Sequence, residues 1–110
     1  MKFNHLIFGL ILFRAYVGFS AELIFELTFK DGIVTPQQLK VPADKKFKIV
    51  VKNQGKTAEE FESLELNREK IVAPGKQITL FLGPLKKDTY TFMGEFHKDQ
   101  ASANGKIIAE

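Results

Sequence analysis

The side chains best suited to chemistry lie in the stretch from Thr89 to His97, Thr-Tyr-Thr-Phe-Met-Gly-Glu-Phe-His. Met93, Glu95 and His97 offer a thioether, a carboxylate and an imidazole, and all three groups are metal ligands. In an extended strand these side chains share one face, because alternate residues point the same way. The strand is expected to end near Gly94, which places Glu95 and His97 on the loop that follows.

A second group of candidate ligands is the carboxylate cluster of Glu59, Glu60 and Glu62. Two like charges about 4 Å apart repel by about 1 kcal/mol in water and by about 4 kcal/mol at an effective dielectric of 20. Such a cluster is therefore either solvated or neutralised by a cation. The plain alternative is that these carboxylates, together with Glu95 and His97, are exposed residues without a ligand.

The sequence offers no set of residues for hydrolysis or group transfer. Ser63 and Ser102 have no evident partners for a Ser-His-Asp arrangement, and no glycine-rich phosphate loop or His-Glu-x-x-His motif occurs. The 110 residues contain no cysteine, which excludes a thiol nucleophile, a thiolate metal site and disulfide redox chemistry. A hydrolase or transferase is not expected.

The first 21 residues have the layout of a secretory signal peptide. Lys2 precedes an apolar run from Leu6 to Phe13, and small residues follow it. Arg14 interrupts the apolar stretch, and a retained span would need about 20 predominantly apolar residues. We therefore expect a secreted domain over residues 22–110 with no membrane insertion after cleavage; a short uncleaved anchor is the alternative.

Charge gives little support for nucleic-acid binding. Removal of the leader lowers the Lys and Arg count from 16 to 14 against 13 acidic residues, so the mature net charge is about +1. The lysines between residues 30 and 56 are scattered over predicted strands and do not form a phosphate track. Nucleic acid is not an expected partner.

The elements that must position these side chains are predicted to be β-strands. Apolar and polar residues alternate over 22–30, 46–53 and 77–82, with a period of two. Shorter strands are expected at 36–42, where flanking prolines suit a sheet edge, and at 105–109.

The segment from Thr57 to Leu66 has two interpretations. It could begin a helix, with Thr57 as N-cap and Glu60 at the capping-box position. A bulged strand or loop is favoured, because the apolar spacing is too short for a helical face and the segment lies among strands. About seven short strands separated by turns, with no long helix, predict one all-β sandwich or barrel.

With these strands placed, the second half of the chain resembles a cupredoxin. Cupredoxins carry Tyr-x-Phe-x-Cys-x-x-His, then a loop with Met and a Gly-Lys-hydrophobic strand. Here Tyr90-Thr91-Phe92-Met93-Gly94-Glu95-Phe96-His97 and Gly105-Lys106-Ile107-Ile108 fall into that frame. The resemblance implies a cupredoxin-like Greek-key β-sandwich of about seven strands.

The copper ligands depart from the cupredoxin pattern. The cysteine position is Gly94, the first histidine falls at Glu59 or Glu60, and the methionine falls near Ala103, so only His97 of the four remains. A blue-copper centre requires its thiolate, and type 1 electron transfer is therefore excluded.

A narrower resemblance covers nearly the whole mature chain. Four short motifs, in order, are similar to the cysteine-poor cupredoxin-like domains of the EfeO type: Glu59-Glu60-Phe61-Glu62-Ser63, Leu66-Asn67-Arg68-Glu69-Lys70, Gly83-Pro84-Leu85 and Gly94-Glu95-Phe96-His97. These are small periplasmic proteins associated with high-affinity iron uptake permeases. The resemblance implies a periplasmic protein that binds an iron or copper ion and assists iron import, by oxidising ferrous iron or by passing it to an iron permease.

By that resemblance Glu60 and His97 are the first metal-ligand candidates, followed by Glu95 and Glu62. Met93 could supply a soft ligand to copper or pack in the core. Oxygen-rich ligation with one imidazole suits iron or Cu(II) better than Cu(I). Two other functions stay open: a metal-free β-sandwich interaction module that docks a membrane transporter, and a ferroxidase.

Overall fold

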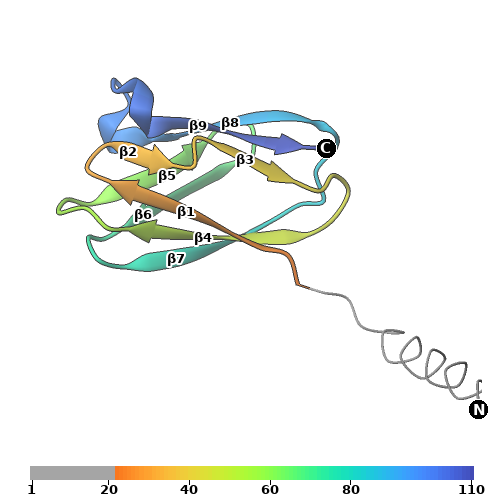
Figure 1. Ribbon diagram of the computed structural model, residues 1–110, viewed down its shortest axis with the longest axis horizontal. Coiled ribbons are helices and arrows are strands. Elements are labelled where there is room, and N and C mark those ends of the chain that lie inside the picture. The colour runs from red at the N-terminus through yellow and green to blue at the C-terminus, as the bar shows by residue number, and fades with distance from the viewer. Residues whose placement is uncertain (1–21) are drawn as a thin grey trace, which may run out of the picture.

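The computed structural model describes residues 22–110, which form a sandwich of two β-sheets (Figure 1). The predicted leader over residues 1–21 lies outside the described residues. The elements are β1 (Ile24–Lys30), β2 (Ile33–Thr35), β3 (Gln38–Val41), β4 (Phe47–Asn53), β5 (Glu59–Ser63), β6 (Arg68–Val72), β7 (Gln77–Leu82), β8 (Asp88–Gly94), the 3-10 turns η1 (Glu95–His97) and η2 (Ala101–Ala103), and β9 (Asn104–Ala109). No helix among these residues is long and apolar enough to span a membrane.

One sheet has the strand order β2-β1-β4-β7 and the other β3-β9-β8-β5-β6. Most neighbours are antiparallel, but β1 pairs with β4 and β3 pairs with β9 in parallel. The predicted all-β sandwich is confirmed. Nine strands are described where about seven were predicted; the two additional ones are the three-residue β2 and the edge strand β6. Neither has a clear alternation of apolar and polar residues.

The core lies between the two sheets and follows the predicted alternation. In β4, Phe47, Ile49 and Val51 are buried and their neighbours are half-buried. In the facing sheet Phe61 of β5 stacks on Phe92 of β8, with ring centroids 5.2 Å apart. Aromatic pairs in this geometry add to the free energy gained by burial alone. This packing therefore fixes β5 and β8 relative to each other, and with them the residues at the ends of the two strands.

The segment from Thr57 to Leu66 contains a strand, so the interpretation as a helix was wrong. A single buried side chain helps to place it: Asn53, at the end of β4, donates from its Nδ2 to the carbonyls of Thr57 and Val72, at 2.9 and 2.8 Å. Its Oδ1 accepts the Gly55 backbone N–H at 2.9 Å. Asn53 thereby joins the β4–β5 loop to β6 and sets where β5 begins.

The alternation of β8 holds only to Gly94, where the strand ends as predicted. Phe92 and Gly94 face inward and Met93 faces outward. The η1 turn then breaks the period of two, so Phe96 is 51% exposed and His97 turns back toward the sandwich. Figure 1 shows η1 and η2 at the end of the sandwich opposite the C-terminus.

Candidate metal site

The first part of the candidate site is a buried carboxylate at the start of β5. Glu59 is only 2% exposed, and its Oε2 lies 2.6 Å from Nδ1 of His97. Its Oε1 accepts backbone N–H groups from Glu60 at 3.0 Å and from Phe96 at 3.2 Å. Because an ionised carboxylate can only accept, the His97 Nδ1 must be the donor in this pair. Both carboxylate oxygens are thus held, in the low dielectric where such bonds are strongest.

Gly94, the last residue of β8, lies next to the same carboxylate. A Cβ added at Gly94 would lie 3.1 Å from Glu59 Cδ and 2.9 Å from the ring of Phe29. The Glu59 carboxylate therefore fills the space next to the position where a cupredoxin carries its thiolate. A thiolate copper centre does not fit this chain, since Gly94 has no side chain and the sequence has no cysteine.

The second part of the candidate site lies on the outer face of β5. The neighbouring carboxyls of Glu69 and then Glu95, which can share a proton with Glu62, raise the pKa of Glu62 to about 7. Glu69 stands directly opposite Glu62 on β6. The pKa of Glu60 is also raised, by partial desolvation and then by the negative charges of Glu69 and Glu95. We call these four neighbouring carboxylates the outer cluster: Glu60, Glu62, Glu69 and Glu95.

The structure separates the five predicted ligands into two groups. Glu60, Glu62 and Glu95 come together in the outer cluster. Met93 is opposite Glu62 in the β5–β8 pair and is half-buried on the same face. His97 instead bonds Glu59 on the inner face. As the side chains stand, residues 22–110 contain no group of three or more His, Asp or Glu arranged to hold a metal ion.

Two residues of this site were not chosen from the sequence. Glu59 and Glu60 were equal candidates for the first histidine position, and the structure places Glu59 inward, against His97. Glu69 was missed because Arg68–Val72 was not predicted as a strand. If β6 had been predicted, a hairpin turn through residues 64–67 would have placed Glu69 opposite Glu62 and identified Glu69 as a member of the site.

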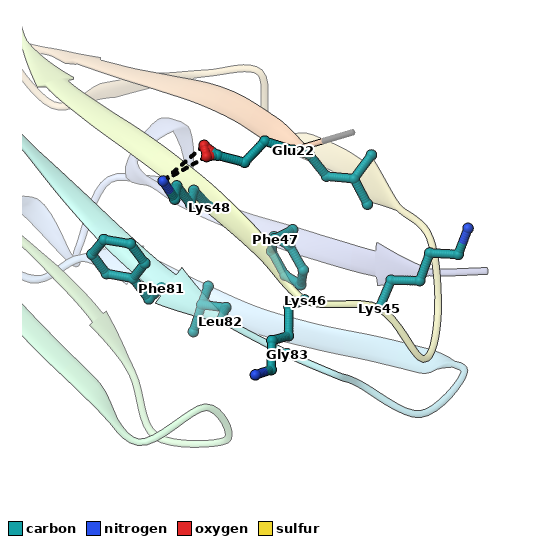
Figure 2. A pocket seen from close by; sticks show the side chains of 9 residues that line it. Glu22, Lys45, Lys46, Phe47, Lys48, Phe81, Leu82 and Gly83 are labelled. Carbon is teal, nitrogen blue, oxygen red and sulfur yellow. Dashed lines mark hydrogen bonds and ion pairs between the residues drawn. The ribbon is translucent and has the colours of Figure 1, made fainter. Parts of the chain in front are cut away.

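A separate surface pocket of about 900 Å³ lies at the opposite end of the sandwich, where β4 begins and β7 ends. Figure 2 shows that Lys48 reaches Glu22, at 2.8 Å, while Lys45 points away from it. Lys48 also lies 5.2 Å from the centre of the Phe81 ring. These lysines do not converge on one point, so the pocket offers no focused anion site.

The sequence is similar to a known protein family and to one bacterial relative. A family model described as a cupredoxin-like domain matches residues 5–109. An uncharacterized protein from Rickettsia prowazekii (strain Madrid E) is 42% identical over 83 residues, which is 76% of this chain. The chain spans 65% of that relative's length.

Two solved structures show the same architecture at low identity. Reduced auracyanin from Roseiflexus castenholzii has a TM-score of 0.63 at 11% identity, over 83% of this chain and 99% of that one. A purple cupredoxin from Nitrosopumilus maritimus has a TM-score of 0.60 at 12% identity, over 78% and 99% of the two chains. At such identities the likeness establishes the fold alone.

Proposed function

The chain belongs to the cupredoxin-like domain family, and from that premise we propose that it binds iron as cargo and serves as a periplasmic accessory of high-affinity iron import. The observation that carries the proposal is the outer cluster: Glu69 stands opposite Glu62 in the β5–β6 pair, and the nearby carboxyls of Glu69 and Glu95 raise the pKa of Glu62 to about 7. Carboxyls as close together as these need either a shared proton or a bound cation to offset their mutual repulsion. A cation that replaces the proton relieves the repulsion among all of the carboxylates.

The donor set suits a hard or borderline cation. Glu60, Glu62, Glu69 and Glu95 supply only oxygen, and carboxylate-rich sites hold iron in the ferritin-like proteins. His97 stays a predicted ligand, because its Nε2 is not used by Glu59. Met93 is the one soft donor on the outer face and would favour copper over iron. Of the two predicted metal ions, iron and copper, we therefore propose iron, bound as cargo.

The location of the cluster is consistent with transfer to a permease. Its carboxyls lie on a surface face of the sheet and are not enclosed in a cavity, so an ion could enter and leave quickly. Without a thiolate at Gly94 the domain lacks the ligand that type 1 electron transfer requires. We therefore propose delivery of iron to an iron permease, with ferrous oxidation as a secondary activity to be assayed.

Calorimetric titration of the mature domain tests this proposal. Fe(II) under anaerobic conditions should bind more tightly than about 1 mM, which corresponds to about −4 kcal/mol. Glu62→Gln and Glu69→Gln should each weaken binding by about tenfold or more, because even neighbours of metal ligands change affinity by about 10-fold to 100-fold. Glu26→Gln is the matched control, since Glu26 is an exposed carboxylate on the opposite sheet. Absence of binding, or equal losses in all three variants, would refute the proposal; Cu(II) is titrated in parallel.

A metal-free docking module is the second candidate, and exposed apolar residues beside the outer cluster favour it. Ile71 stands opposite Glu60 and is 59% exposed, and Phe96 follows Glu95 and is 51% exposed. Capture of the detergent-solubilised permease on the immobilised domain separates the two functions. Docking alone predicts capture that survives a chelator and Glu62→Gln but is lost in Ile71→Ser.

A further inference from the structure

The Glu59 carboxylate joins two segments that are distant in the sequence. It stands at the first position of β5, and its partners Phe96 and His97 belong to η1, 37 and 38 residues later. We infer that Glu59 performs, in this chain, the structural task that a copper ion has in a type 1 cupredoxin, and acts as the positioning residue of the η1 turn. A metal ion in a cupredoxin frame likewise ties separate segments to one point, through ligand bonds instead of hydrogen bonds.

Three features of the geometry support this exchange. The bond to His97, at 2.6 Å, is as short as the strongest charge-assisted hydrogen bonds. The Glu59 side chain is 3% exposed and that of His97 is 24% exposed, so water competes weakly for the pair. Every buried side-chain oxygen and nitrogen in residues 22–110 has a hydrogen-bond partner, so the Glu59 carboxylate is satisfied without a metal ion.

The packing around Gly94 supports the same conclusion. A side chain at this position would press on both Glu59 and Phe29, at 3.1 and 2.9 Å from its Cβ. The carboxylate and a side chain at position 94 thus compete for one space. In this chain the Glu59 carboxylate therefore fills the space beside position 94 at the end of β8.

The turn held by Glu59 also carries a carboxyl of the outer cluster. Glu95 opens η1, two residues before His97, and its carboxyl is one of the neighbours that raise the pKa of Glu62. Glu59 does not touch the proposed cargo, because it faces the other side of β5. It would act on the cluster by fixing the turn, beside the small effect of its charge, which contributes to the raised pKa of Glu60. This second step rests on the proposed iron binding.

The test compares Glu59→Gln with Glu60→Gln in the mature domain, by NMR. Both variants exchange a carboxylate for an amide at neighbouring positions of β5, but of the two side chains only that of Glu59 hydrogen-bonds to η1. Since a neutral hydrogen bond is about half as strong as a charge-assisted one, the Phe96 amide should exchange about tenfold faster in Glu59→Gln. In Glu60→Gln its exchange rate should match the wild type.

A second measurement needs no variant. The wild type should show a protected ring N–H resonance for His97 Nδ1, unchanged when EDTA is added. Loss of that resonance with EDTA would mean that a metal ion holds this end, and would overturn the inference. Equal Phe96 exchange in the two variants would overturn it as well.

Titration of the same variants with Fe(II) separates this inference from the proposed function. If Glu59 positions Glu95, Glu59→Gln should bind Fe(II) about tenfold more weakly than wild type, although it removes no proposed ligand. If the wild type binds no iron, the proposed function fails. The amide exchange and the His97 resonance then decide the structural inference by themselves.

Discussion

The two faces of β5 show how one strand can carry the same side chain in opposite roles. On the inner face Glu59 is buried, with each oxygen held by donors from the backbone or His97. On the outer face Glu62 meets other carboxyls, and the pKa of Glu62 rises to about 7. The inner carboxylate is satisfied by its neighbours, whereas the outer one is repelled by them. A cation would therefore gain more on the outer face, where it relieves repulsion, than on the inner face, where it must displace existing bonds.

The difference arises from the two-residue period of the strand and from what faces each side. Inward residues of β5 face the second sheet, and Glu59 among them bonds the η1 turn. The outward Glu62 faces other carboxyls, those of Glu69 on β6 and Glu95 on η1. The identity of the residue says little about its role, because three of the five residues of β5 are glutamates. Substitutions on the two faces should therefore have very different effects on the free energy of unfolding.

The largest contrast is expected between two phenylalanines. Phe61 is fully buried in β5 and stacks on Phe92, so Phe61→Ala should lower the free energy of unfolding by about 3–5 kcal/mol. Phe96→Ala makes the same chemical change at a residue that is 51% exposed, and should cost far less. Urea unfolding followed by circular dichroism measures both. Similar losses in the two variants would mean that the inner face is not the core side of β5.

Gly94→Ala should give the next largest loss, and it tests the packing beneath Glu59. Gly94 has φ of −84°, which any residue can adopt, so the cost is steric alone. Its new Cβ would meet the Phe29 ring and Glu59, and overpacking of this kind costs about 1–3 kcal/mol.

Thr89→Ala, an exposed position on the same strand, is the control for Gly94→Ala, and thermal unfolding of both variants gives the comparison. A Gly94→Ala protein as stable as wild type would show that Glu59 can move aside.

Much of the fold could be predicted from the sequence, because burial between two sheets imposes a simple period. In β1, β4 and β7 more buried residues alternate with less buried ones, as the alternation of apolar and polar residues in the sequence predicts. The edge strand β6 could not be recognised, since Glu69, Lys70 and Ile71 are all exposed and carry no alternation. Its pairing with β5 follows from the turn between them and not from its own residues.

The candidate site was predictable in composition but not in arrangement. His97 was predicted to lie with the carboxylates of Glu60, Glu62 and Glu95, and its partner in the structure is Glu59. The sequence does not indicate which of the neighbouring residues Glu59 and Glu60 faces inward. The strand was predicted to end near Gly94, and beyond it the period of two gave no direction for Phe96 and His97; in the η1 turn Phe96 is 51% exposed and His97 bonds Glu59. A 3-10 turn of three residues leaves no periodic pattern from which this could be read. The predicted ligand set of Glu60, Glu62, Glu95, Met93 and His97 remains a prediction.

A smaller effect is expected from a buried hydroxyl at the end of the inner face. Ser63 Oγ donates to the Thr91 carbonyl at 2.7 Å and accepts the Leu66 backbone N–H at 3.1 Å. Ser63→Ala leaves both backbone groups without this partner, which should lower the free energy of unfolding by about 1–2 kcal/mol. Thr79→Ala, at an exposed position on β7, should change it by less than about 0.5 kcal/mol. Equal values in urea unfolding would contradict the assignment of the hydroxyl as a bridge.

The smallest expected effect is a pH dependence that belongs to the outer face alone. Hydrogen bonds to Glu69 and then Glu95 raise the pKa of Glu62 from 4.5 to about 7 in the folded protein. The folded state thus binds its proton more tightly than the unfolded state, and this contribution to stability is fully present below pH 4.5. It is lost as the pH rises toward 7, because the ionised carboxylates then repel. Melting temperatures measured from pH 4.5 to 8 should therefore fall less steeply in Glu62→Gln than in wild type, while Glu26→Gln keeps the wild-type slope. If Glu62→Gln also keeps that slope, the outer carboxyls do not share a proton, and the contrast between the two faces of β5 would rest on the inner pair alone.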